Sequence, residues 1–311
     1  MSIAASGLAH SVLTRLIRHA QSLSVDPNLV LTRFATERLL YRLYRSRHFD
    51  RFVLKGGLLL LIWFGETFRV TRDADLLGFG DLSDNSLVAI LSEICTTEVE
   101  PDAVMFDTSS IRISAIRPED IYGGRRITLL ARLGSARIRL QVDVGMGDTT
   151  IPEPEWIEYP GILDFPRPRL RAYRPETVIA EKAHAMVQLG TKNSRMRDFF
   201  DVYMLSQRES FDSKLLAAAF RATFDRRETA IPTGIPMVLT AEFAHLPDKR
   251  AQWTGFLKKN RLTTVPEDIA TILRVLAEFL APIFNAGTQK KDGGSLWPPG
   301  GPWKPIGKEG R

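Results

Sequence analysis

The residues best suited to chemistry lie between positions 55 and 76. Lys55-Gly56-Gly57 precedes a short apolar run, and Asp73-Ala74-Asp75-Leu76 follows it. Side chains alternate along a strand, so a strand over 73–76 would place both carboxylates on one face. Glycines let phosphate oxygens approach the backbone N–H groups. Together these features predict a site for Mg²⁺ carrying a nucleoside triphosphate.

A third carboxylate follows from a later strand. Residues 137–144 alternate cleanly, with Ile138, Leu140 and Val142 on one side and Arg139, Gln141 and Asp143 on the other. This pattern is typical of a strand with one face in the core, and it predicts Asp143 as a further metal ligand. Two ions held this way would activate a hydroxyl and hold a triphosphate. The alternative for an isolated Asp-x-Asp is a turn or a solvated strand end.

A second cluster lies in a helical pattern after Pro175. Lys182 falls among apolar residues, where it could reach a β- or γ-phosphate. Asp198 and Asp201 are three residues apart and share one helix face. They could orient Lys182, Arg195 or Arg197, or one of them could act as a general base. An ordinary network of ion pairs between helices is the open alternative.

Composition sets broader limits. The chain has 311 residues, 42 Lys and Arg against 36 Asp and Glu, and a single cysteine. The modest positive charge favours a polyanionic partner such as RNA or a nucleotide. One cysteine excludes a disulfide within the chain and fits the cytoplasm, and no apolar run is long enough to cross a membrane. The basic side of the helix after Pro27 is expected to be a solvated face, and the alternative is a surface that binds the phosphates of RNA. The basic residues are Arg33, Arg38, Arg42, Arg45 and Arg47.

The pattern along the chain changes midway. Residues 1–150 read as an α/β domain with N-terminal helices, and the proline-rich residues 151–174 as an extended connector. Residues 175–286 read as a helical domain, and residues 287–311, rich in Gly, Pro and Lys, as a disordered tail. The lone His184 and Cys95 are expected to be structural, and Trp253 and Phe256 are expected to be core residues.

The motifs in this order resemble the AbiEii/AbiGii family of nucleotidyltransferase toxins, including the MenT type. The matching phrases begin at Phe52, Arg69, Gln141, Pro175 and Arg195 and cover roughly residues 30–205. The resemblance implies an α+β fold: a polymerase-β-like nucleotidyltransferase domain with a mixed sheet, then a mostly helical domain. It also implies Mg²⁺ (or Mn²⁺), an NTP donor such as ATP, GTP or CTP, a cognate antitoxin and a role in phage defence.

The resemblance assigns roles residue by residue. Gly56-Gly57 would contact the triphosphate, Asp73 and Asp75 would bind metal, and Lys182, Asp198 and Asp201 would complete the catalytic set. The nucleotide-binding residues predicted beside these motifs are Lys55, Arg69, Thr71, Arg72, Lys182, Arg195 and Arg197. Leu58 stands where the family often has a small hydroxyl residue, which leaves backbone N–H groups as the donors at this turn.

Three functions are compatible with these residues. The first is NMP transfer to the 3′ acceptor end of tRNA by a toxin, which would block translation. The second keeps the fold but modifies a small molecule or a protein. The third is an inert protein that acts only by binding a partner. The nucleotide selected, the tRNA or other acceptor, the antitoxin mechanism, the oligomeric state and the role of residues 207–285 do not follow from the sequence.

Overall fold

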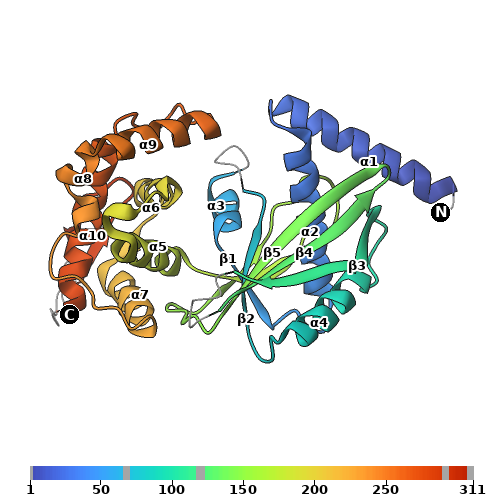
Figure 1. Cartoon of the computed structure of the whole chain (residues 1–311), viewed down its shortest axis with the longest axis horizontal. Coiled ribbons are helices and arrows are strands. Elements are labelled where there is room, and N and C mark those ends of the chain that lie inside the picture. Colours follow the sequence, from blue (N-terminus) through green and yellow to red (C-terminus); the bar gives the residue numbers. More distant parts are fainter. Residues whose placement is uncertain (1–2, 66–70, 117–122, 289–293, 307–311) are drawn as a thin grey trace. The chain divides into compact units, whose positions relative to one another are not determined.

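The computed structural model describes residues 3–65, 71–116, 123–288 and 294–306. The chain forms two compact units, shown in Figure 1. Unit 1 comprises residues 1–148 and 155–173, and unit 2 comprises residues 149–154 and 174–311.

Unit 1 is built on a seven-stranded mixed sheet with the order β3-β4-β5-β2-β1-β7-β6. The pairs β2/β5 and β1/β7 are parallel, and the other neighbours are antiparallel. This confirms the predicted mixed sheet. The strands are β1 (Phe52–Lys55), β2 (Ala74–Gly78), β3 (Val104–Ala115), β4 (Arg125–Leu133), β5 (Ala136–Met146), β6 (Glu155–Glu158) and β7 (Arg169–Ala172).

Four helices belong to unit 1: α1 (Ile3–Ser22), α2 (Pro27–Arg45), α3 (Gly57–Phe64) and α4 (Asp84–Thr96). Asp26 caps α2 by accepting a hydrogen bond from the Asn28 N–H at 3.0 Å, and Pro27 takes the first helical position. Ser83 caps α4 in the same way. Both helices present leucine-rich sides to the sheet.

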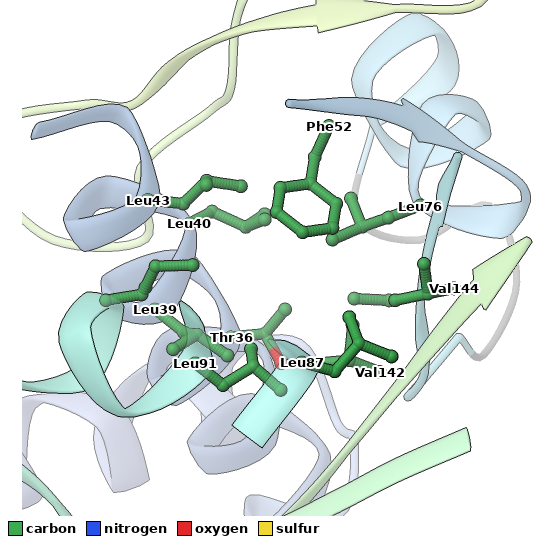
Figure 2. Close-up of a pocket in the computed structure, with 12 residues that line it drawn as sticks. Thr36, Leu39, Leu40, Leu43, Phe52, Leu76, Leu87, Leu91, Val142 and Val144 are labelled. Carbon is green, nitrogen blue, oxygen red and sulfur yellow. The ribbon is translucent and has the colours of Figure 1, made fainter. Parts of the chain in front are cut away.

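Between α2, α4 and the sheet lies the apolar core of unit 1. Figure 2 shows Leu40, Phe52, Leu76 and Val142 converging on a small gap of about 20 Å³ in this core. Its lining is apolar apart from Thr36, so it is a packing defect and not a ligand site. Since side chains alternate in β2 and β5, this packing directs Asp75 and Asp143 to the opposite face of the sheet.

Unit 2 is mostly helical, as predicted. Its larger helices are α5 (Pro175–Leu189), α6 (Met196–Arg208), α7 (Ser213–Arg226), α9 (Pro247–Asn260) and α10 (Ile269–Thr288), with a short α8 (Ala241–His245). A small sheet joins β8 (Phe211–Asp212), β9 (Ser295–Trp297) and β10 (Lys304–Pro305). Trp253 is fully buried, in agreement with its expected core position.

Residues 151–174, predicted as an extended connector, have a different structure. It contributes two strands, and β7 pairs with β1 in the interior of the sheet. Pro168 and Pro175 flank β7 and leave its own N–H groups free to pair. Residues 149–154 belong to unit 2 and residues 155–173 to unit 1, so the boundary is crossed more than once.

The tail prediction for 287–311 also differs over residues 294–306. Trp297 is buried and donates its indole N–H to the Ser206 carbonyl at 2.7 Å. Trp303 stacks on Phe279 and donates to the Phe279 carbonyl at 3.0 Å. Two large aromatic side chains supply enough buried area to hold a Gly- and Pro-rich segment in place.

The basic side of α2 is not a solvated face. Arg33, Arg38 and Arg42 are buried. Arg42 makes a two-pronged ion pair with Asp102 at 2.6 and 3.0 Å, and Arg38 pairs with Glu37. Arg45 and Arg47 are exposed. Acids on the helix itself (Glu37) and elsewhere in unit 1 (Asp102) pair with these buried arginines, so this helix gives no support to an RNA-binding surface.

Candidate active site

A row of four charged side chains crosses the sheet of unit 1. Lys55 on β1 lies opposite Asp75 on β2, Asp75 lies beside Asp143 on β5, and Asp143 lies opposite Arg126 on β4. Partners in register share a face, so all four point away from the apolar core of Figure 2. The order of charge is positive, negative, negative, positive. We call these four residues the charged row.

Asp73 extends this row along the chain. It comes directly before β2, two residues ahead of Asp75, and its side chain is exposed. The pKa of Asp75 is raised, first by burial and then by the neighbouring charges of Asp143 and Asp73, against the lowering effect of Lys55. The three predicted metal ligands therefore lie within electrostatic reach of one another, and they leave a negative field that a cation would relieve.

The turn at Gly56 brings backbone against this field. Gly56 has φ +72°, and a Cβ at this position would lie 2.0 Å from a carboxylate oxygen of Asp75. The Gly57 N–H, in the first turn of α3, donates a hydrogen bond to Asp75. Only glycine leaves room for this approach. Gly56 is thus explained by the carboxylate beside it, and the contact of this turn with phosphate stays a prediction.

Arg126 is a site residue that the sequence reasoning missed. Its guanidinium holds Asp143 through two hydrogen bonds of 2.9 and 2.7 Å, and Gln141 donates a third at 3.3 Å. The pKa of Arg126 is raised by this hydrogen bonding and by the charges of Asp143, Asp73 and Asp75. The sequence offers no local sign of this pairing, because Arg126 and Asp143 lie on different strands, 17 residues apart.

The carboxylate oxygens suit a hard cation such as Mg²⁺. Among the residues that the structure describes, no three His, Cys, Asp or Glu side chains form a ready metal-binding group. Both oxygens of Asp143 accept hydrogen bonds from Arg126. Asp73 and Asp75 could hold an ion through carboxylate oxygens, whereas at Asp143 the Arg126 guanidinium would compete with the metal for the same oxygens.

Lys55 is held at the other end of the row. Its Nζ lies 2.6 Å from an Asp148 carboxylate oxygen and over the ring of Tyr173, with the Tyr173 hydroxyl at 3.5 Å. Asp148 and Tyr173 were not identified from sequence. This arrangement makes Lys55 a fixed positive charge beside Asp75, and its predicted contact with nucleotide stays a prediction.

The predicted cluster of unit 2 does come together. Lys182 on α5 contacts Asp198 and Asp201 on α6, both at 2.8 Å, and Arg195 pairs with Asp198 at 2.8 Å. Both carboxylates are almost fully buried. Burial opposes ionisation of Asp198, but the charges of Lys182 and Arg195 outweigh it and hold its pKa below the usual range. The structure therefore contains an ion-pair network between α5 and α6, which was the alternative to a phosphate-binding role for Lys182.

The remaining predicted nucleotide contacts are less organised. Arg72 is exposed and makes a 3.5 Å ion pair with Asp26, Thr71 is buried, and Arg197 is exposed. Arg69 lies outside the described residues. Asp73, Asp75 and Asp143 belong to unit 1, and Lys182, Asp198 and Asp201 belong to unit 2.

The two residues expected to be structural fit that role. His184 is buried, hydrogen-bonds Thr229 at 3.0 Å and meets the Phe224 ring edge-on. Burial, with a contribution from Arg227, lowers the pKa of His184 to about 4. Burial raises the pKa of the Cys95 thiol to about 12. Within the described ranges, every helix is too short or too polar to cross a bilayer.

Comparison with solved structures identifies the class of fold. JHP933 from Helicobacter pylori matches with a TM-score of 0.51 and 14% identity, over 85% of this chain and 94% of that protein. A protein from H. pylori assigned as a nucleotidyltransferase matches with a TM-score of 0.52 and 15% identity, over 86% of this chain and 99% of that one. At such identities the likeness shows a common fold. No curated protein matches the sequence.

The family follows from the sequence itself. Residues 38–275 match the family model described as nucleotidyl transferase AbiEii toxin, type IV toxin–antitoxin system. This range covers most of the chain and includes every predicted site residue. The chain belongs to the AbiEii family of nucleotidyltransferase toxins, which confirms the family that its motifs resemble.

Proposed function

We propose that this enzyme transfers a nucleoside monophosphate from an NTP to the 3′ end of tRNA, as the toxin of a toxin–antitoxin pair. The observation that carries the proposal is the charged row with Asp73 beside it, facing the N-terminus of α3. Carboxylates suited to a divalent cation and backbone donors suited to phosphate occur side by side. A cognate antitoxin partner is implied by the family.

The chemistry is an in-line displacement. The 3′-hydroxyl oxygen of the acceptor forms a bond to the α-phosphorus, the bond from that phosphorus to the bridging oxygen breaks, and pyrophosphate leaves. When bound by Asp73 and Asp75, Mg²⁺ or Mn²⁺ would lower the pKa of the attacking hydroxyl and neutralise the triphosphate. The attacking hydroxyl gives up its proton to water as its bond to the phosphorus forms.

The unit 2 cluster has a supporting place in this proposal. The resemblance assigns Lys182 to the triphosphate and Asp198 and Asp201 to the catalytic set. Both carboxylates hold the Lys182 ammonium, so they are suited to position it and poorly suited to act as bases. Arg195 adds a second positive charge to the same cluster. Their direct contact with nucleotide stays a prediction.

Labelled NTPs and total tRNA test the proposal. With Mg²⁺, label should enter tRNA and should fail to enter tRNA whose 3′ ribose has been oxidised with periodate. Asp75→Asn should abolish the transfer. Asp50→Asn, a matched change at an exposed aspartate of unit 1, should not.

Other outcomes select the alternatives. Label in small molecules or in protein, with none in tRNA, would replace the acceptor and keep the chemistry. No label anywhere, together with no Mg²⁺-dependent nucleotide binding, would favour an inert partner-binding protein. Full transfer by Asp75→Asn would reject the assigned role of the charged row.

A further inference from the structure

The open face of strands β3, β4 and β5 carries a concentration of arginine. Between β4 and β5 four cross-strand pairs share this face: Arg132/Arg137, Leu130/Arg139, Thr128/Gln141 and Arg126/Asp143. The intervening residues, such as Ile138, Leu140 and Val142, are buried on the other face. Three of the four pairs therefore contain arginine. One of these three, Arg126/Asp143, lies at the end of the face and is part of the charged row. We call this surface the arginine track.

The track contains an arrangement that costs stability. Arg132 and Arg137 lie directly opposite each other, and like charges in this position destabilise a strand pair. Within the described part of the chain, neither Arg137 nor Arg139 has an ion-pair partner, and both are exposed. Asp107 and Asp143 are acids on this face: the charge of Asp107 interacts with Arg132, and Asp143 pairs with Arg126. Arg137 and Arg139 keep no acidic partner among the described residues, so their end of the face is positive.

Apolar surface is interleaved with the arginines. Leu130 is 38% exposed opposite Arg139, and Met105 on β3 is 46% exposed opposite Arg132. Arginine fits phosphate through its planar set of donors, and exposed apolar side chains beside it can contact a ribose or base. A solvated surface needs neither the like-charge pair nor the exposed apolar residues.

The direction of the track matches the proposed reaction. Arg137 lies six residues before Asp143 on one strand, which is a distance of about 20 Å at roughly 3.4 Å per residue. At roughly 3.4 Å per stacked nucleotide, this spans about six nucleotides of one strand. An acceptor end laid along β5 would thus reach the carboxylates with its terminal hydroxyl.

We infer that the arginine track binds the phosphate backbone of the acceptor RNA and leads its 3′ end to the charged row. This inference rests on the proposed function, which it deepens by naming the acceptor-binding surface. Arg137 and Arg139 are binding residues in it. They lie too far along β5 from Asp143 to touch the reacting phosphorus.

The test compares two double variants with the same loss of charge. Arg137→Gln/Arg139→Gln removes the track, and Arg18→Gln/Arg221→Gln removes two exposed arginines elsewhere, one on α1 and one on α7. Fluorescence anisotropy with a labelled tRNA acceptor stem bearing a single-stranded 3′ end gives affinity over a range of salt. The track variant should bind about tenfold more weakly at physiological salt, and its log–log salt slope should fall by about 1.4, at roughly 0.7 for each lost phosphate contact.

Two further readouts separate binding from folding and from chemistry. Arg137→Gln alone should melt at or above the temperature of the wild type, because it removes the repulsion from Arg132. Calorimetric binding of Mg²⁺–NTP should be the same in all variants.

The inference would be overturned if the track variant had the same RNA affinity and salt slope as the control variant. That result is expected if the true occupant of this face is an acidic protein. Failure of the wild type to bind the acceptor stem would overturn it too. RNA binding through the track without nucleotide transfer would instead reject the proposed function and leave the track as a binding surface.

Discussion

Removal of the Lys182 ammonium is expected to destabilise unit 2 strongly. Lys182→Met keeps most of the side-chain volume but leaves the Asp198 and Asp201 carboxylates, which are 1% and 0% exposed, without their shared partner. Breaking a buried ion pair from one side costs about 3–5 kcal/mol, because the remaining charge stays buried. Arg195 still pairs with Asp198, so the lower part of this range is expected.

The effect should depend on pH in a stated direction. In the wild type the pKa of Asp198 is lowered despite its burial, chiefly by Lys182, so the ion pair stabilises the fold at neutral pH. This contribution is lost as pH falls through the folded pKa, below the usual range of an aspartate. In Lys182→Met burial dominates and the pKa of Asp198 rises. The variant therefore takes up a proton in mild acid, and its deficit should shrink between pH 7 and pH 4.

Urea unfolding followed by tryptophan fluorescence measures this, since three of the five tryptophans, Trp253, Trp297 and Trp303, belong to unit 2. Lys192→Met, an equal change at an exposed lysine, should stay within about 0.5 kcal/mol of wild type. Lys182→Met/Asp201→Leu should be more stable than Lys182→Met, because it removes a stranded charge.

A Lys182→Met variant within about 1 kcal/mol of wild type at pH 7 would refute this reasoning. It would show that water or a rearrangement of side chains stabilises the buried carboxylates in place of the lysine. The reasoning also bears on activity measurements. If the variant is as unstable as expected, a loss of nucleotide transfer would not by itself establish that the lysine contacts phosphate.

Three further predictions concern the two units separately. Gly56→Ala should abolish transfer and cost at least about 1–2 kcal/mol of folding stability, because a Cβ there meets a carboxylate of the charged row. The control is Gly134→Ala, also at positive φ but with ordinary contacts, which should lose stability and keep activity. Equal activities of the two variants would contradict the role of the turn. Arg126→Met should bind Mn²⁺ severalfold more tightly by calorimetry, because Asp143 is released, and weaker binding would show that the arginine does not compete with the ion. Trp297→Ala should destabilise unit 2 by about 3–5 kcal/mol in urea, whereas a disordered tail would give no change.

Much of unit 1 could be predicted because short segments of its sequence contain the alternation of apolar and polar residues that is typical of strands. Alternation over 137–144 placed Asp143 correctly on the polar face of β5. The glycine pair and Asp75 were close enough in sequence to be read as one site, and the structure adds their direct contact. These features depend on periods of two residues and on turn geometry, which short windows of sequence contain.

The features that were missed depend on partners distant in sequence. Arg42 was read as solvated because nothing near it indicates Asp102, 60 residues later. Strand β7 has four residues, and its assignment requires knowing that β1 has an open edge. Trp297 was placed in a disordered tail because composition describes a segment's average, whereas packing depends on single large side chains.

The way unit 1 is assembled has a practical consequence for dissecting the enzyme. The polypeptide leaves unit 1 after residue 148, returns at 155 and leaves again after 173, so one cut cannot separate the two halves cleanly. A fragment ending near residue 150 would lack β6 and β7 and would expose the backbone of β1, the strand that ends at Lys55. Such a bare edge invites pairing with other chains. Fragment studies should therefore retain the chain through Tyr173.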